Sequence, residues 1–146
     1  MDPHAVRPLT RNSLRCGTGR ALGTDPDAHA DEIDAAVDEG HSHVRIDVPW
    51  ARAEPRPGAI DGDVVEDLRG AIDHAHGAGM TVWCRLLQAE VPRWFDNEGG
   101  FGDDHTAARW WPRWVDRVAE LLGDHVDGWV PLEAPFGISA RLAPGD

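Results

Sequence analysis

Polar residues that could do chemistry follow three short apolar segments of the sequence. Arg45 and Asp47 lie within the segment VRIDV, and Glu133 lies near the end of WVPLEAP. Gln88 and Glu90 come directly after MTVWCRLL. In parallel α/β sheets the functional groups gather at the C-terminal ends of the strands. We therefore expect these side chains to lie at one edge of a sheet.

Glu133 is the residue in this set that is best suited to proton transfer. A glutamate at a strand end can act as a general acid when burial keeps it protonated near neutral pH. The ordinary alternative is a solvated loop glutamate, which is the more frequent state of a glutamate side chain. The position of the strand end therefore decides whether Glu133 is catalytic.

Two histidine pairs, HSH at 41–43 and HAH at 74–76, suggest metal ligation, because alternate residues of a strand share a face. The first pair stands at the start of its expected strand, away from the catalytic edge. The second stands near a helix end, where residues i and i+2 point apart. We therefore expect neither a metal site nor a cofactor.

Aromatic residues crowd the segment before the last expected strand, where Trp94, Trp110, Trp111 and Trp114 occur. Their helical spacing indicates that most of them belong to the core. Sugar rings stack on indole faces. Trp94 and Trp50 are the better candidates for such a platform.

The glycine-rich segment GTGRALG at 17–23 could cradle a dinucleotide phosphate after a strand. No strongly apolar strand precedes it, and no helix starts directly after it. An irregular loop is the favoured interpretation.

Strand and helix patterns alternate along the chain, with roughly 35 to 45 residues per unit. Strands are expected at 13–16, 44–48, 80–87 and 129–132, and helices at 25–40, 63–77 and 107–122. Such alternation predicts a parallel sheet with right-handed crossovers. Residues 1–12 are expected to form a polar arm and residues 13–146 one domain.

The charge and composition exclude several functions. The 146 residues carry a net charge of −12, so a nucleic acid or an anionic membrane would be repelled. All 14 basic residues are arginine, which cannot form a Schiff base. No apolar run approaches a membrane span or a signal peptide, and Cys16 and Cys84 are too few for a disulfide framework. We therefore expect a cytoplasmic protein.

Three segments in their order resemble the N-terminal half of family 1 glycoside hydrolases, the β-glucosidase family. They are VRIDVPWARAEPRPG, LLQAEVPRWFDNEGGF and GDHVDGWVPLEAP. The resemblance spans about residues 28 to 136. It implies part of a (β/α)8 TIM barrel, with about four parallel strands and three main helices, and hydrolysis of β-glycosidic bonds.

The resemblance also implies roles for individual residues. Arg45 falls where the family has an arginine that contacts the nucleophile, and Gln88 falls where it has a sugar-binding histidine. Trp50 and Glu90 are expected to contact substrate as well. In an ungapped alignment, Glu133 takes the place of the family's asparagine, and Ala134 takes the place of its acid/base glutamate.

That displacement bears on catalysis. A retaining glycosidase needs two carboxylates about 5 to 5.5 Å apart, and the family's nucleophile half has no counterpart in this sequence. We therefore expect a truncated family relative that binds β-glucoside-like carbohydrate and whose retaining β-glycosidase activity is weak or lost. The alternative is a non-catalytic carbohydrate-binding or assembly module.

An open set of four barrel strands would expose two strand edges and an apolar face. Proteins avoid that state by pairing. We expect self-association or a complementary half-barrel chain. A nucleotide-binding α/β domain that uses residues 17–23 is a third, weaker alternative.

Overall fold

The computed structural model describes residues 18–87 and 90–132, which form a parallel sheet covered by helices. The strands are β1 (Gly19–Ala21), β2 (His43–Asp47), β3 (Thr81–Leu87) and β4 (Gly128–Leu132), in the order β1-β2-β3-β4. Every neighbouring pair is parallel. The predicted parallel α/β sheet is confirmed.

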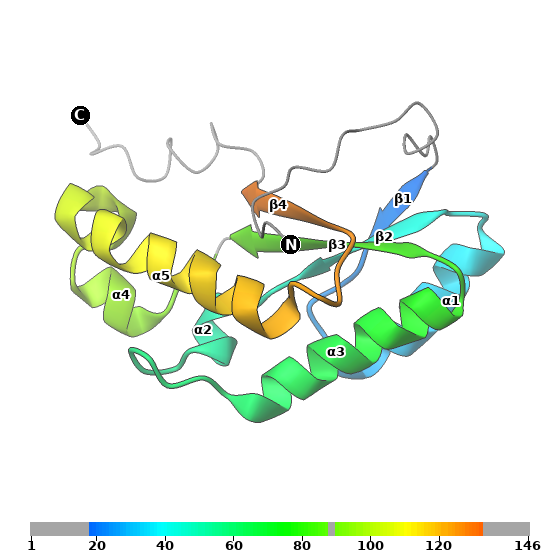
Figure 1. Ribbon diagram of the computed structural model, residues 1–146, viewed down its shortest axis with the longest axis horizontal. Coiled ribbons are helices and arrows are strands. Elements are labelled where there is room, and N and C mark those ends of the chain that lie inside the picture. The colour runs from blue at the N-terminus through cyan, green and yellow to red at the C-terminus, as the bar shows by residue number, and fades with distance from the viewer. Residues whose placement is uncertain (1–17, 88–89, 133–146) are drawn as a thin grey trace, which may run out of the picture.

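The helices differ in length and in position. They are η1 (Pro26–Ala28), α1 (His29–Asp38), α2 (Trp50–Ala53), α3 (Gly62–Gly77), α4 (Arg93–Asn97), η2 (Gly100–Gly102) and α5 (Asp104–Leu122). The long helices α1, α3 and α5 lie on one side of the sheet, and the short α2 and α4 lie beyond the ends of β2 and β3 (Figure 1). The strand ends and the short helices together form the edge where functional groups were expected.

Aspartate side chains cap the start of three helical segments. Asp25 accepts a hydrogen bond from the Asp27 N–H at the start of η1, and Asp61 accepts one from the Asp63 N–H at the start of α3. Hydrogen bonding from Thr106, through its side chain first and then its backbone N–H, lowers the pKa of Asp103 at the start of α5. A charged cap complements the positive end of the helix.

Pro112 lies inside α5, which runs through it without a break. The sequence predicts a kink or a restart there, and the restart does not occur. Proline removes one backbone N–H from the helix ladder. Pro112 is exposed, so water can satisfy the carbonyl left without that donor.

The two faces of the sheet differ in burial. Val44, Ile46, Val82, Cys84 and Leu86 are buried on the face that the helices cover. The residues between them, which point to the opposite face, are Arg45, Asp47, Trp83 and Arg85, and Trp83 is 41% exposed. β3 is therefore buried on one face only, because no described element covers the face that bears Trp83.

The start of the sheet also departs from expectation. The predicted strand at 13–16, including Cys16, and the predicted arm at 1–12 lie outside the described residues. Residues 17–23 were expected to form a loop, yet Gly19–Ala21 pairs with β2. A Cβ at position 19 would lie 2.0 Å from Nε2 of His43, so a larger residue there would require the His43 ring to move. The close approach of this ring explains a glycine in a strand.

An aromatic cluster fills the core between α5 and the loops after β2 and β3. Trp50 stacks on Trp114, with ring centroids 5.3 Å apart and an interplanar angle of 12°. The rings around this pair belong to Trp94, Phe95, Phe101 and Trp111. This cluster fixes the short helices against the C-terminal edge of the sheet.

Candidate functional site

A hollow of ≈ 410 Å³ opens at the C-terminal ends of β2 and β3. Polar side chains and short apolar ones share its wall, and its lining residues are Thr24, Asp47, Pro49, Ala51, Arg52, Arg85 and Glu90. This is the end of a parallel sheet at which α/β proteins bind ligands. The volume lies within the range of small-molecule sites.

Asp47 and Arg85 form an ion pair in the wall of this hollow. Arg85 donates from Nε to Asp47 Oδ1 at 2.7 Å and from Nη2 to Asp47 Oδ2 at 2.5 Å. The two residues are partners in the β2–β3 register, so both side chains point to the same face. The bidentate geometry orients the carboxylate.

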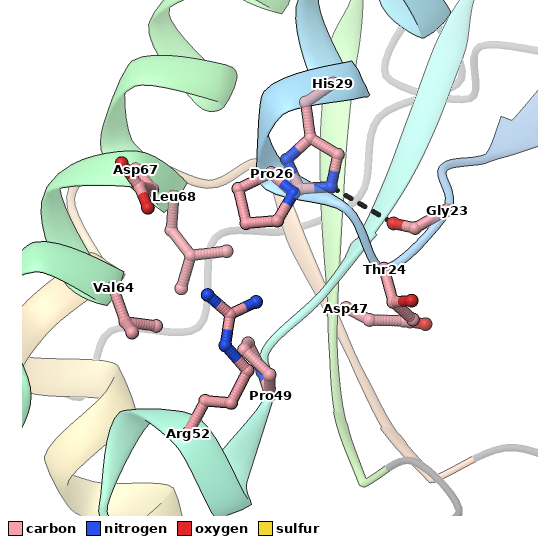
Figure 2. A pocket seen from close by; sticks show the side chains of 10 residues that line it. All are labelled: Gly23, Thr24, Pro26, His29, Asp47, Pro49, Arg52, Val64, Asp67 and Leu68. Carbon is pink, nitrogen blue, oxygen red and sulfur yellow. Dashed lines mark hydrogen bonds between the residues drawn. The ribbon is translucent and has the colours of Figure 1, made fainter.

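A smaller pocket of ≈ 20 Å³ lies behind the hollow and shares Thr24, Asp47, Pro49 and Arg52 with it. Figure 2 shows His29 on the far side of this pocket from Arg52, with a hydrogen bond from Nε2 to the Gly23 carbonyl at 3.1 Å. His29 is 6% exposed, and its Nδ1 has no hydrogen-bond partner. The pocket has room for a single water molecule.

The structure brings some of the predicted site residues together. Glu90 lines the hollow with Asp47. Arg45 is half-buried on the same sheet face and lies two residues before Asp47 along β2. Gln88 and Glu133 lie outside the described residues. The predicted acid position at Glu133 and Ala134 lies outside them too.

Trp50 does not offer an indole face to a ligand. It is 1% exposed, and its Nε1 donates a hydrogen bond to Glu54 Oε2 at 2.8 Å. Trp94 is half-buried and donates from Nε1 to the Glu54 carbonyl at 2.9 Å. The expected sugar platform on Trp50 is therefore wrong, because the aromatic core encloses the ring.

The histidine pairs bond separately to carboxylates. His74 Nε2 lies 2.8 Å from Asp34 Oδ1, and His76 Nε2 lies 2.9 Å from Asp127 Oδ2. His41 Nε2 lies 3.2 Å from a carboxylate oxygen of Glu39. Within residues 18–87 and 90–132, no three histidine, cysteine or acidic side chains gather closely enough to hold a metal.

The turn after β1 is closed by the protein itself. The Gly23 N–H donates a hydrogen bond to Glu32 Oε2 at 2.7 Å. A carboxylate therefore stands close to the backbone that a dinucleotide phosphate would need, and like charges repel. This geometry argues against the nucleotide-binding alternative.

Arg85 and Thr24 are lining residues that sequence reasoning missed. Arg85 is the one charged residue in the run MTVWCRLL, and Asp47 is the next-to-last residue of VRIDV. A charge inside an apolar strand is costly without a partner. That cost was a usable signal for the Asp47–Arg85 pair, whereas nothing in the pattern around Thr24 marked it.

No helix of the described residues is long and apolar enough to cross a membrane.

Comparison with protein-family models finds no match. Two curated relatives are similar in sequence. The lactase/phlorizin hydrolase of Rattus norvegicus is 26% identical over 114 residues, which cover 77% of this chain and 6% of that protein. Thermostable beta-glucosidase B of Thermobispora bispora is 27% identical over 122 residues, which cover 80% of this chain and 26% of that protein. The chain thus spans about a quarter or less of the length of these relatives.

Solved structures agree with the sequence relatives. A beta-glucosidase named 1317 is 28% identical with a TM-score of 0.67, over 75% of this chain and 28% of its own. The family 1 β-glucosidase of Thermotoga maritima has a TM-score of 0.73 at 20% identity, over 80% of this chain and 27% of its own. Over roughly four fifths of its length, this chain resembles about a quarter of a family 1-type β-glucosidase, and its sheet is a partial (β/α)8 barrel.

Proposed function

We propose that this chain is a β-glucosidase-related protein that binds β-glucoside-like carbohydrate. The observation that carries the proposal is the polar hollow at the C-terminal ends of β2 and β3. The sheet around it is similar in fold to β-glucosidases. Ligand sites of (β/α)8 barrels lie at this end of the strands.

Hydrolysis of β-glycosidic bonds is proposed to be weak or absent in the 146-residue chain. The relatives that the chain resembles are about three times as long as this chain. Retaining hydrolysis needs an acid/base and a nucleophile across one glycosidic bond. We assign Glu133 and Arg45 to the catalytic side of the site, and Gln88 and Glu90 to substrate binding.

Two measurements on the purified chain test this function together. Glucose or cellobiose titrated against tryptophan fluorescence is expected to give a saturable change, because the indoles of Trp94 and Trp110 lie near the loops around the sheet end. An aryl β-glucoside is expected to give no turnover above buffer. Turnover that Glu133→Gln abolishes would show an active glycosidase, and the absence of any fluorescence response would contradict carbohydrate binding.

We also propose that the chain self-associates or pairs with a complementary half-barrel chain. Trp83 and Leu132 are each 41% exposed on the strands β3 and β4, and no described strand pairs with the outer edges of β1 and β4. Unpaired edges and exposed apolar residues favour association. Light scattering should give a mass above 16.0 kDa for the purified chain. A mass of one chain at micromolar concentration would contradict self-association.

We propose a cytoplasmic location from the state of Cys84, the cysteine among the described residues. Burial raises the pKa of the Cys84 thiol to about 12, so this side chain is a protonated, inert part of the core. A protein that uses its cysteine in this way has no need of an oxidising compartment. Fractionation of cells that express the chain tests the location.

A further inference from the structure

We propose that Asp47, oriented by Arg85, accepts hydrogen bonds from the hydroxyl groups of the carbohydrate that the hollow binds. The inference rests on the proposed carbohydrate binding. It names the residue whose hydrogen bonds would distinguish one sugar from another. Asp47 is thereby a binding residue, and Arg85 is a positioning residue that acts through it.

The geometry leaves the carboxylate able to accept further hydrogen bonds. An ionised carboxylate has about four lone-pair sites, and Arg85 uses one on each oxygen. The Asp47 side chain is 9% exposed and the Arg85 side chain is 20% exposed, and both line the hollow. The remaining lone pairs are therefore within reach of a ligand in the hollow.

The pair fixes the direction in which those lone pairs point. Two parallel N–H···O bonds from a planar guanidinium hold a carboxylate in one orientation, which a single contact to an ammonium would not. Sugar epimers differ only in the direction of a hydroxyl group. An acceptor with a fixed direction is the kind of group that can distinguish them.

The charges around the hollow select the ligand class. Two guanidinium groups, Arg52 and Arg85, face two carboxylates, Asp47 and Glu90, so the wall carries no net charge. None of the described lining residues is aromatic. The whole chain is strongly acidic, which disfavours an anionic ligand. A neutral polyhydroxy ligand, recognised through its hydroxyl hydrogens, fits this wall best.

A purely structural ion pair is the competing explanation. Buried ion pairs contribute little net stability, because desolvation offsets their attraction. A structural pair would also leave ligand affinity unchanged as long as the protein stays folded. The two roles are therefore separable by measuring affinity and stability in the same variants.

The test is isothermal titration calorimetry of the purified chain with glucose and with sodium glucuronate. We expect glucose to bind and glucuronate to bind more weakly. Asp47→Asn should weaken glucose binding about 10-fold to 100-fold, since a charged acceptor becomes a neutral one and its bidentate pairing with Arg85 is lost. Arg85→Lys keeps the positive charge but cannot make two parallel hydrogen bonds to the Asp47 carboxylate. We expect a smaller loss of glucose affinity, of several-fold.

A ligand series ties the effect to one contact. Among 2-deoxy-, 3-deoxy- and 6-deoxyglucose, at least one should bind the wild type more weakly than glucose does. The difference in affinity between that sugar and glucose should be smaller for Asp47→Asn than for the wild type, because the amide is a weaker partner for the missing hydroxyl. A structural role of the pair would leave the deoxy series unchanged by the substitution.

Glu120→Gln is the matched control. Glu120 accepts a hydrogen bond from Arg117 at 3.1 Å on the exposed face of α5, so the same chemical change occurs away from the hollow. Thermal unfolding of each variant establishes that binding is measured on folded protein. Wild-type glucose binding that Asp47→Asn leaves unchanged overturns the role of Asp47 but not carbohydrate binding, whereas no binding by the wild type overturns both.

Discussion

Trp50→Ala is expected to lower the free energy of unfolding by about 3 to 5 kcal/mol. The Trp50 ring is 1% exposed and stacked on Trp114 at the centre of the aromatic cluster. Removing the indole leaves a cavity among rigid rings that cannot close around a methyl group. Stacked aromatic pairs add about 0.5 to 1.5 kcal/mol beyond their buried area, and the variant loses that contribution too.

Urea unfolding followed by far-ultraviolet circular dichroism measures the effect of Trp50→Ala. Trp83→Ala is the matched control, because it removes the same side chain from a position that is 41% exposed. We expect the control to cost no more than about 1.5 kcal/mol. Equal losses in the two variants would contradict the placement of Trp50 in the core.

Much of the fold could be predicted because the local signals and the packing agree. Val44, Ile46 and Val48 alternate with polar residues, and the structure buries all three against helices. Asp25 and Gly40 bracket the first helical segment as their capping preferences predict. Such periodic segments depend on neighbours a few residues away, so the sequence contains the information.

β1 could not be predicted because its pairing is nonlocal. Gly19–Ala21 has no apolar alternation, and its place in the sheet depends on β2, more than 20 residues away. The exposure of Trp83 was missed for a related reason. A run of apolar letters in MTVWCRLL does not tell whether a second layer covers the sheet.

The candidate site was predicted in its location more than in its members. The rule for strand ends selected the edge that bears Asp47 and Glu90, and both line the hollow. Arg85 joins them through the β2–β3 register, which is set by the sheet and not by any local motif. Trp50 was misassigned because the sequence does not distinguish an aromatic ring exposed in a site from one buried in the core next to it.

The second large effect is expected at Glu54. This carboxylate is 8% exposed and directly follows the short helix α2. Glu54 Oε2 accepts from Trp50 Nε1 at 2.8 Å, and Oε1 accepts from the Gly58 N–H at 2.7 Å. Glu54→Ala leaves the buried Trp50 indole N–H without an acceptor, whereas the Gly58 N–H lies in an exposed turn that water can reach. We expect a loss of about 2 to 4 kcal/mol in the free energy of unfolding.

A double-mutant cycle assigns the part of the loss at Glu54 that comes from the indole N–H. In a Trp50→Phe background that donor is absent, so Glu54→Ala should cost about 1 to 2 kcal/mol less than it does in the wild type. Additive effects of the two substitutions would mean that the hydrogen bond contributes nothing.

Glu98→Ala provides the exposed counterpart of the same bond. Glu98 Oε2 accepts from Trp110 Nε1 at 2.8 Å, and both partners can reach water. In Glu98→Ala, water can replace the carboxylate as the acceptor of the Trp110 indole N–H. We therefore expect the free energy of unfolding to change by no more than about 0.5 kcal/mol. The two glutamates make bonds of equal length to an indole N–H, but Glu54 is buried and also accepts from the Gly58 N–H. A difference in urea midpoints between Glu54→Ala and Glu98→Ala therefore measures what it costs to leave a buried donor unsatisfied beside this site, and equal midpoints would show that water reaches both.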